Sequence, residues 1–245
     1  MSEALYLPYT PPWKWRQFQQ HFALRLLPGV EALDDESYSR SVRLGNQVGW
    51  FRVRPLRGQP LLELQLSDSL YAQATALVPR IRKAFDLDAA PSALAAHFAG
   101  DPLLGPLVAE APGLRLPAAF DPFEQSVRAI IGQQVSVKAA VTITRRLVER
   151  LGEPLPANSV GLDRLFPTAG AIAAGSLGNI GMPGKRVAAL QQLAAAVAEG
   201  AFQLEVIADA DELVKRLCRL PGIGPWTAEY IALRGFWGAG CISGG

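Results

Sequence analysis

The stretch LPGIGPWTAEYIALRG, residues 220–235, predicts a tight turn directly before a helix. Its first six residues hold two glycines and two prolines, and the residues that follow favour a helix. Glycines permit positive φ, and Pro225 has the fixed φ of a first helical turn. Because a further helix is predicted over 211–219, we expect a helical hairpin in which Ile223 fills the gap between the helices.

The same stretch brings main-chain donors and aromatic rings close together in the sequence. Because glycines leave no side chain over the turn, the unpaired N–H groups of Gly222, Ile223 and Gly224 should face an accessible surface that suits a phosphate oxygen. Trp226 and Tyr230 are four residues apart, so they share one helix face and can form an aromatic wall. A plain turn between packed helices, with two core aromatic residues, is the structural alternative.

The second half of the chain shows repeated helix signals. Asp121, Pro122 and Glu124 place an N-cap, a proline at the first helical position and an acidic residue at the start of a predicted helix that ends near Gly132. Further helices are predicted over 137–150, 185–199 and 211–219.

The first half mixes strand and helix signals. Residues 42–70 alternate in a strand-like way, and helical stretches over 13–27 and 71–85 frame them. The predicted fold class is therefore α+β. We expect a small strand-rich N-terminal domain over residues 1–88 and an all-α domain over residues 89–245.

Four stretches carry a family resemblance that covers nearly the whole chain. They are the hairpin over residues 220–235, FDPFEQSVRAIIGQQVS over 120–136, LGNIGMPGKRVAAL over 177–190, and Tyr38 to Ser41. Together they resemble the helix-hairpin-helix base-excision DNA glycosylases, in particular the DNA-3-methyladenine glycosylase II (AlkA-type) branch.

The resemblance implies a DNA repair enzyme that acts on double-stranded DNA with alkylated bases. Such an enzyme flips a 3-methyladenine-type purine out of the duplex and hydrolyses its N-glycosidic bond. Lyase-type relatives carry a Schiff-base lysine where this chain has Trp226, so a monofunctional enzyme that uses water is implied. Alkylated purines such as 3-methyladenine are cationic, which suits an aromatic wall.

Site residues follow from the same resemblance. The base pocket is predicted to contain Gln133, Trp226 and Tyr230. The predicted DNA-binding residues are Gln134 as the intercalating wedge, where the family has an apolar residue, and Gly222, Ile223, Gly224 and Thr227 of the hairpin. Lys185 and Arg186 are added because they stand at a predicted helix start after Gly184, where basic side chains can contact phosphate.

The chain departs from the family after the hairpin helix. Family members carry a catalytic aspartate there, whereas this sequence has no Asp or Glu beyond Glu229, so no catalytic residue is predicted. We expect a truncated or shifted reading frame, and DNA binding with little release of 3-methyladenine. A lesion-recognition protein without catalysis and a helical interaction domain are the alternatives.

Composition excludes several classes. Two cysteines and two histidines exclude a disulfide framework and a cysteine-ligated iron–sulfur cluster and disfavour a structural zinc site, so no metal and no cofactor are expected. No apolar run approaches the roughly 18–20 residues of a membrane span, and the N-terminus lacks a secretory signal. We expect a cytoplasmic monomer without membrane partners.

Overall fold

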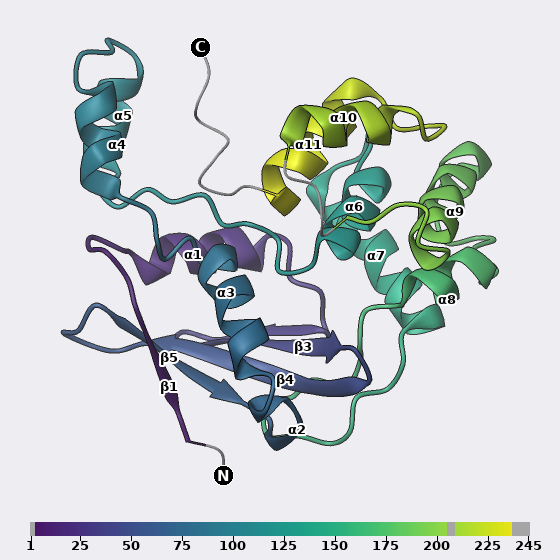
Figure 1. The fold of residues 1–245 in the computed structure, drawn as a ribbon, viewed down its shortest axis with the longest axis horizontal. Helices are drawn as coiled ribbons and strands as arrows, with labels where there is room; N and C mark the ends of the chain where they lie inside the picture. The colour runs from purple at the N-terminus through teal and green to yellow at the C-terminus, as the bar shows by residue number, and fades with distance from the viewer. Residues whose placement is uncertain (1–2, 205–208, 237–245) are drawn as a thin grey trace.

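The computed structural model describes residues 3–204 and 209–236, and its N-terminal part is built on an antiparallel sheet (Figure 1). The strands lie in the order β1-β5-β4-β3-β2. Their bounds are β1 Leu5–Pro8, β2 Glu31–Leu33, β3 Tyr38–Leu44, β4 Gln47–Pro55 and β5 Leu61–Leu66. β4 and β5 lie within the predicted strand-like stretch over 42–70, whereas β3 begins four residues before it. β1 and β2 are too short to show a period in the sequence.

Helices cover the sheet and build an aromatic core against it. They are α1 Trp15–Ala23, α2 Asp68–Tyr71 and α3 Ala74–Ala84. Phe18 of α1 stacks on Phe85, with ring centroids 5.8 Å apart, and Phe51 of β4 is fully buried. Burial of these rings, together with the leucines of β5, stabilises this part.

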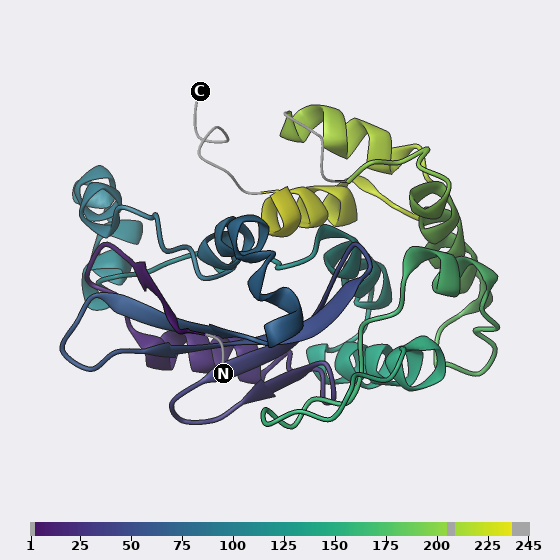
Figure 2. The same ribbon diagram turned by 60° about the horizontal axis from the view of Figure 1, so that its bottom comes forward.

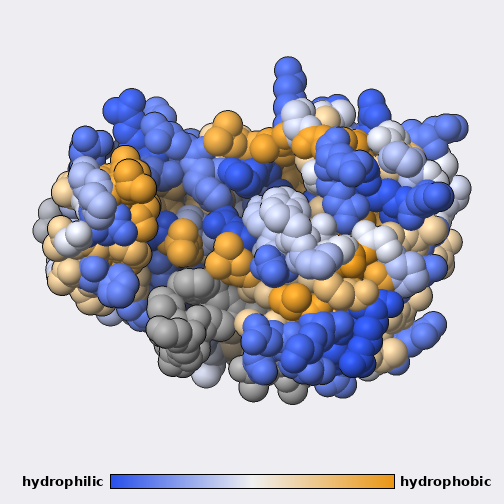
Figure 3. Space-filling model, turned by 90° about the horizontal axis from the view of Figure 1, so that it is seen from above, coloured by the Kyte–Doolittle hydropathy of each residue, from blue (hydrophilic) through white to orange (hydrophobic). Residues whose placement is uncertain are grey.

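A helix pair that the sequence did not predict stands away from the sheet. It consists of α4 Pro91–Phe98 and α5 Leu104–Glu110, at the left of Figure 1. Leu103, Leu104 and Leu107 are exposed. Figure 3 shows hydrophobic surface at the left end of the molecule, where this helix pair lies. The pair follows α3, so the predicted boundary between residues 88 and 89 falls in the connection before it and stays a prediction.

The remaining described elements are helices around a second core. They are α6 Pro122–Ile131, α7 Val137–Leu151, α8 Ala169–Ala174, α9 Gly184–Ala198, α10 Ala210–Cys218 and α11 Pro225–Phe236. Asp121 caps α6, because its Oδ1 accepts the Glu124 N–H at 2.8 Å. Four of the helices match the sequence predictions within two residues at each end, and α8 was not predicted. The α+β class is confirmed.

Helix α11 occupies the middle of the molecule. Figure 2 shows it beside α3, with α10 above it and α6 below. Lys83 of α3 donates to the Gly235 carbonyl oxygen at 3.2 Å, which ties the end of α11 to the N-terminal part. In the described part of the chain, no helix is long and apolar enough to cross a membrane.

Candidate functional site

The turn between α10 and α11 has the expected hairpin geometry. Ile223 is 4% exposed and packs in the helical core, so it fills the gap between the helices as predicted. Its N–H donates to the Leu220 carbonyl oxygen at 3.2 Å. The expectation of an unpaired N–H at Ile223 is therefore wrong, because the turn itself uses this donor.

The two glycines of the turn have different surroundings. Gly222 has φ +84°, and a Cβ built there would lie 2.7 Å from the Cβ of Ala189 on α9. At Gly224 a Cβ would meet nothing within 4 Å. Both glycines are exposed, and their N–H groups have no hydrogen-bond acceptor among the described residues. These two donors are available to a ligand.

Gln133 joins the end of α6 to the hairpin. Its Nε2 donates to the Gly222 carbonyl oxygen at 3.0 Å and to Thr227 Oγ1 at 3.1 Å. Thr227 is buried, so a contact of this residue with DNA would have to come from its main chain. Gln134, at φ +56°, is exposed beside this junction.

Trp226 and Tyr230 form a parallel stack on α11. Their ring centroids are 5.7 Å apart and the planes differ by 1°. Trp226 is 69% exposed, whereas Tyr230 is half-buried and lines a cavity of about 80 Å³. Of the three predicted base-pocket residues, Tyr230 lines this cavity, Trp226 lies outside it, and Gln133 contacts the hairpin instead.

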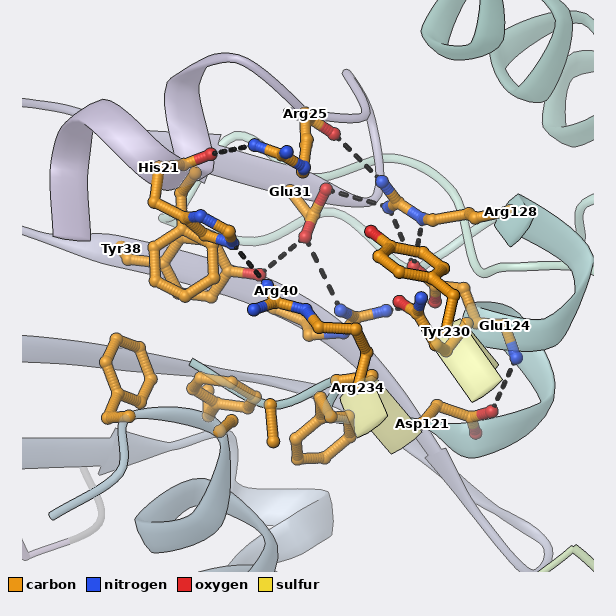
Figure 4. Close-up of a pocket in the computed structure, with 18 residues that line it drawn as sticks. His21, Arg25, Glu31, Tyr38, Arg40, Asp121, Glu124, Arg128, Tyr230 and Arg234 are labelled. Atoms are coloured by element: carbon orange, nitrogen blue, oxygen red, sulfur yellow. Dashed lines mark hydrogen bonds and ion pairs between the residues drawn. The ribbon is translucent and has the colours of Figure 1, made fainter. Parts of the chain in front are cut away.

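The cavity lies between the sheet and helices α1, α6 and α11, and charged side chains form much of its wall (Figure 4). Four of them form what we call the buried charge network: Glu31, Arg40, Glu124 and Arg128. Arg128 contacts Glu31 at 2.9 Å and Glu124 at 2.7 Å. Arg40 contacts Glu31 at 3.4 Å and also binds Glu124. The network joins β2, β3 and α6.

The network is electrically balanced and mostly shielded from water. Burial alone would raise the pKa of Glu31, but Arg128, Arg40 and the hydroxyl of Tyr38, which donates at 2.6 Å, outweigh it and lower that pKa. Burial and the Glu31 charge raise the pKa of Tyr38 well above its usual value. The Glu31 carboxylate is therefore held as an acceptor for the two arginines.

A second cluster in the cavity wall contains His21, Arg25 and Arg234. Arg234 Nη2 donates to His21 Nε2 at 2.7 Å. Burial and the charges of Arg234 and Arg25, against a smaller opposing effect of Glu31, lower the pKa of His21 to about 4. His21 is therefore neutral near pH 7.

Lys185 and Arg186 lie in the first turn of α9. Lys185 is exposed and Arg186 is half-buried. Because residues four apart share a helix face, Lys185 lies one turn from Ala189, the residue under Gly222. This predicted DNA-binding residue is thus on the helix that supports the hairpin.

Known proteins resemble the chain over most of its length. The family model "AlkA N-terminal domain" matches residues 4–121. The DNA-3-methyladenine glycosylase 2 of Escherichia coli is 37% identical over 233 residues, which cover 94% of this chain and 80% of that protein. The chain belongs to the DNA-3-methyladenine glycosylase family of DNA repair enzymes.

Another curated protein and two solved structures are also similar to the chain. A Mycobacterium tuberculosis protein named probable bifunctional transcriptional activator/DNA repair enzyme AlkA is 34% identical over 95% of this chain and 46% of its own length. The 3-methyladenine DNA-glycosylase from Archaeoglobus fulgidus has TM-score 0.78 at 21% identity, covering 93% of this chain and 77% of that one. A structure of MBOgg1 in complex with a low-affinity DNA ligand has TM-score 0.68 at 18% identity. The match covers 87% of this chain and 71% of that chain. The two structures share the fold of this chain.

The buried charge network was not predicted from the sequence. Glu124 was interpreted as a residue of the helix start, and its main chain does receive the Asp121 cap, but its side chain binds Arg40 and Arg128. The available signal was Arg40, which stands between two serines in β3. This signal does not indicate that the partner of Arg40 is Glu124, 84 residues away.

Proposed function

We propose that this chain binds double-stranded DNA through the hairpin face and receives an extruded alkylated purine beside Tyr230. The main support is that the open N–H groups of Gly222 and Gly224 lie at the start of the helix that carries the Trp226–Tyr230 stack. Amides at a helix N-terminus suit a phosphate oxygen. Stacked rings suit a base taken out of the duplex.

Base removal would be hydrolytic. The bond between the sugar C1′ and the purine nitrogen breaks, and the base leaves with the electron pair, so a cationic base departs neutral. The water oxygen bonds to C1′, and the proton that the water loses passes to solvent. Trp226 stands where a Schiff-base lysine would be needed for lyase chemistry. A monofunctional glycosylase is therefore proposed.

We also propose that the 245-residue polypeptide releases bases slowly. Positive charge develops on the sugar during cleavage, and a fixed carboxylate stabilises it. Among the described residues that line the cavity, the acidic side chains are already engaged: Glu31 and Glu124 bind the arginines of the buried charge network, and Asp121 accepts the Glu124 N–H. Loss of one preorganised electrostatic group costs roughly 10²–10³ in rate. Lesion recognition without release is the second candidate on the same grounds.

The proposal is tested by binding and release measured on the same duplexes. Fluorescence anisotropy should show an affinity that falls steeply with salt, and a preference for a duplex with one 7-methylguanine over the unmodified duplex. Trp226→Ala should bind the modified and unmodified duplexes equally well, and its affinity for both should still fall with salt. Leu233→Ala, an exposed apolar residue on the same helix, is the control. Absence of salt-dependent binding would refute the proposal, whereas rapid base release would refute only slow catalysis.

A further inference from the structure

Two guanidinium groups in the cavity wall lack the carboxylate partners that their neighbours have. Figure 4 shows Arg25 and Arg234 on either side of His21. Among the residues that the structure describes, neither arginine forms an ion pair with an acidic side chain. Arg25 donates to the His21 carbonyl oxygen at 3.4 Å, and Arg234 donates to the His21 ring.

The nearby acidic groups are already bound elsewhere. Glu31 and Glu124 contact Arg40 and Arg128, and Asp121 Oδ1 accepts the Glu124 N–H. His21 offers a neutral acceptor and no negative charge. The cavity wall at His21 therefore carries an excess of positive charge in half-buried surroundings.

Such an arrangement is unfavourable without an anion. A cation removed from water needs a partner of opposite charge or several acceptors. Burial and the nearby Arg25 charge lower the pKa of Arg234, against an opposing effect of Tyr230, so the two cations do disfavour each other. Each guanidinium has five N–H donors, and one of each is used by His21, so enough remain for an incoming oxyanion.

We propose that Arg25 and Arg234, separated by His21, form a binding site for a small oxyanion in the wall of the Tyr230 cavity. The cavity volume of about 80 Å³ exceeds the roughly 10–15 Å³ that one water needs, so a formate-sized group fits. The fork geometry of guanidinium matches a carboxylate or a phosphate group. This site goes beyond the proposed function, since it requires neither DNA nor base release.

The two histidines of the chain provide the readout. At pH 7 the ring of His21 is neutral and hydrogen-bonded to Arg234, so its proton NMR signal responds to an anion beside that guanidinium. His97 is exposed on α4 and serves as the internal control. Sodium formate added at constant ionic strength with sodium chloride should shift the His21 signal along a saturable curve and leave His97 in place.

Variants assign the effect to the two arginines. Arg25→Gln and Arg234→Gln should each weaken formate binding at least about tenfold, the loss expected for a charge-assisted hydrogen-bonded pair. Arg57→Gln removes an exposed arginine that pairs with Glu36 and should change nothing. Arg25→Lys keeps the charge and the fold while removing the fork, and should bind formate more weakly than the parent.

Phosphate replaces formate in a parallel titration. Tighter binding of formate assigns the site to carboxylates and tighter binding of phosphate assigns it to phosphate groups, and either result supports an oxyanion site. A His21 signal that moves no more than that of His97, or a formate shift that survives the Arg25→Gln/Arg234→Gln double substitution, would overturn the proposal. Both outcomes are independent of DNA binding, so they leave the proposed function untouched.

Discussion

The hairpin and the buried charge network are held together in different ways. The hairpin relies on residues within one short stretch, where a glycine at positive φ, a proline and a buried isoleucine fix the turn. The network joins side chains of two strands and one helix, and its longest contact spans 97 residues. Main-chain geometry is thus encoded locally, whereas charge pairing depends on the finished fold.

The largest expected effect comes from removing one member of the network. Glu31→Gln leaves Arg40 and Arg128 without one carboxylate and should lower the free energy of unfolding by about 3–5 kcal/mol. Urea denaturation measures it. Glu36→Gln, on an exposed side chain, should change it by less than about 0.5 kcal/mol. Equal effects of the two substitutions would contradict a stabilising role of the network.

The second-largest loss of stability should come from adding one methyl group to the hairpin turn. Gly222→Ala introduces a methyl group 2.7 Å from the Ala189 Cβ at φ +84°, and should cost about 1–3 kcal/mol in unfolding free energy. Gly224→Ala, where the added carbon meets nothing within 4 Å, is the matched control. If thermal unfolding ranks the two variants in the opposite order, the described turn is incorrect.

Low pH should destabilise the folded chain through His21, which lies in the cavity between the sheet and helices α6 and α11. The pKa of His21 is about 4 in the folded chain and near 6.5 when unfolded, so the unfolded state binds the proton first as the pH falls. The free energy of unfolding should therefore be unaffected by His21 above about pH 6.5 and should fall as the pH drops toward 4. The total loss should be about 1–2 kcal/mol after allowance for solvent screening. His21→Gln should flatten the stability curve over this range in urea titrations. His97→Gln should not.

The link between α6 and the hairpin should show the smallest effect. Gln133→Ala removes the hydrogen bonds to Gly222 and Thr227 and should cost about 1 kcal/mol. Gln134→Asn, at the neighbouring left-handed position that asparagine tolerates, should be close to neutral. Chemical denaturation of both variants measures the two unfolding free energies, and the value for Gln133→Ala should be the lower one.

The same comparison explains which features could be predicted from the sequence. Residues 121–124 and 220–225 carry their own caps and turns, so the α6 start and the hairpin followed from local rules. The cavity could not be predicted, because His21, Glu31, Arg40 and Arg234 meet only after the sheet packs on α6 and α11. The use of the Ile223 N–H within the turn was missed, because residue type does not show which donors a turn satisfies.

The most direct test of the central claim is the duplex affinity of Gly224→Asp. Aspartate is a good residue before a helix and its charge suits the helix N-terminus, so stability should be unchanged or slightly higher. The same side chain would place bulk and negative charge where we propose that a phosphate binds. Anisotropy at low salt should therefore show at least a tenfold loss of duplex affinity in a fully folded variant. Unchanged affinity in that variant would contradict the claim that the hairpin main chain contacts DNA.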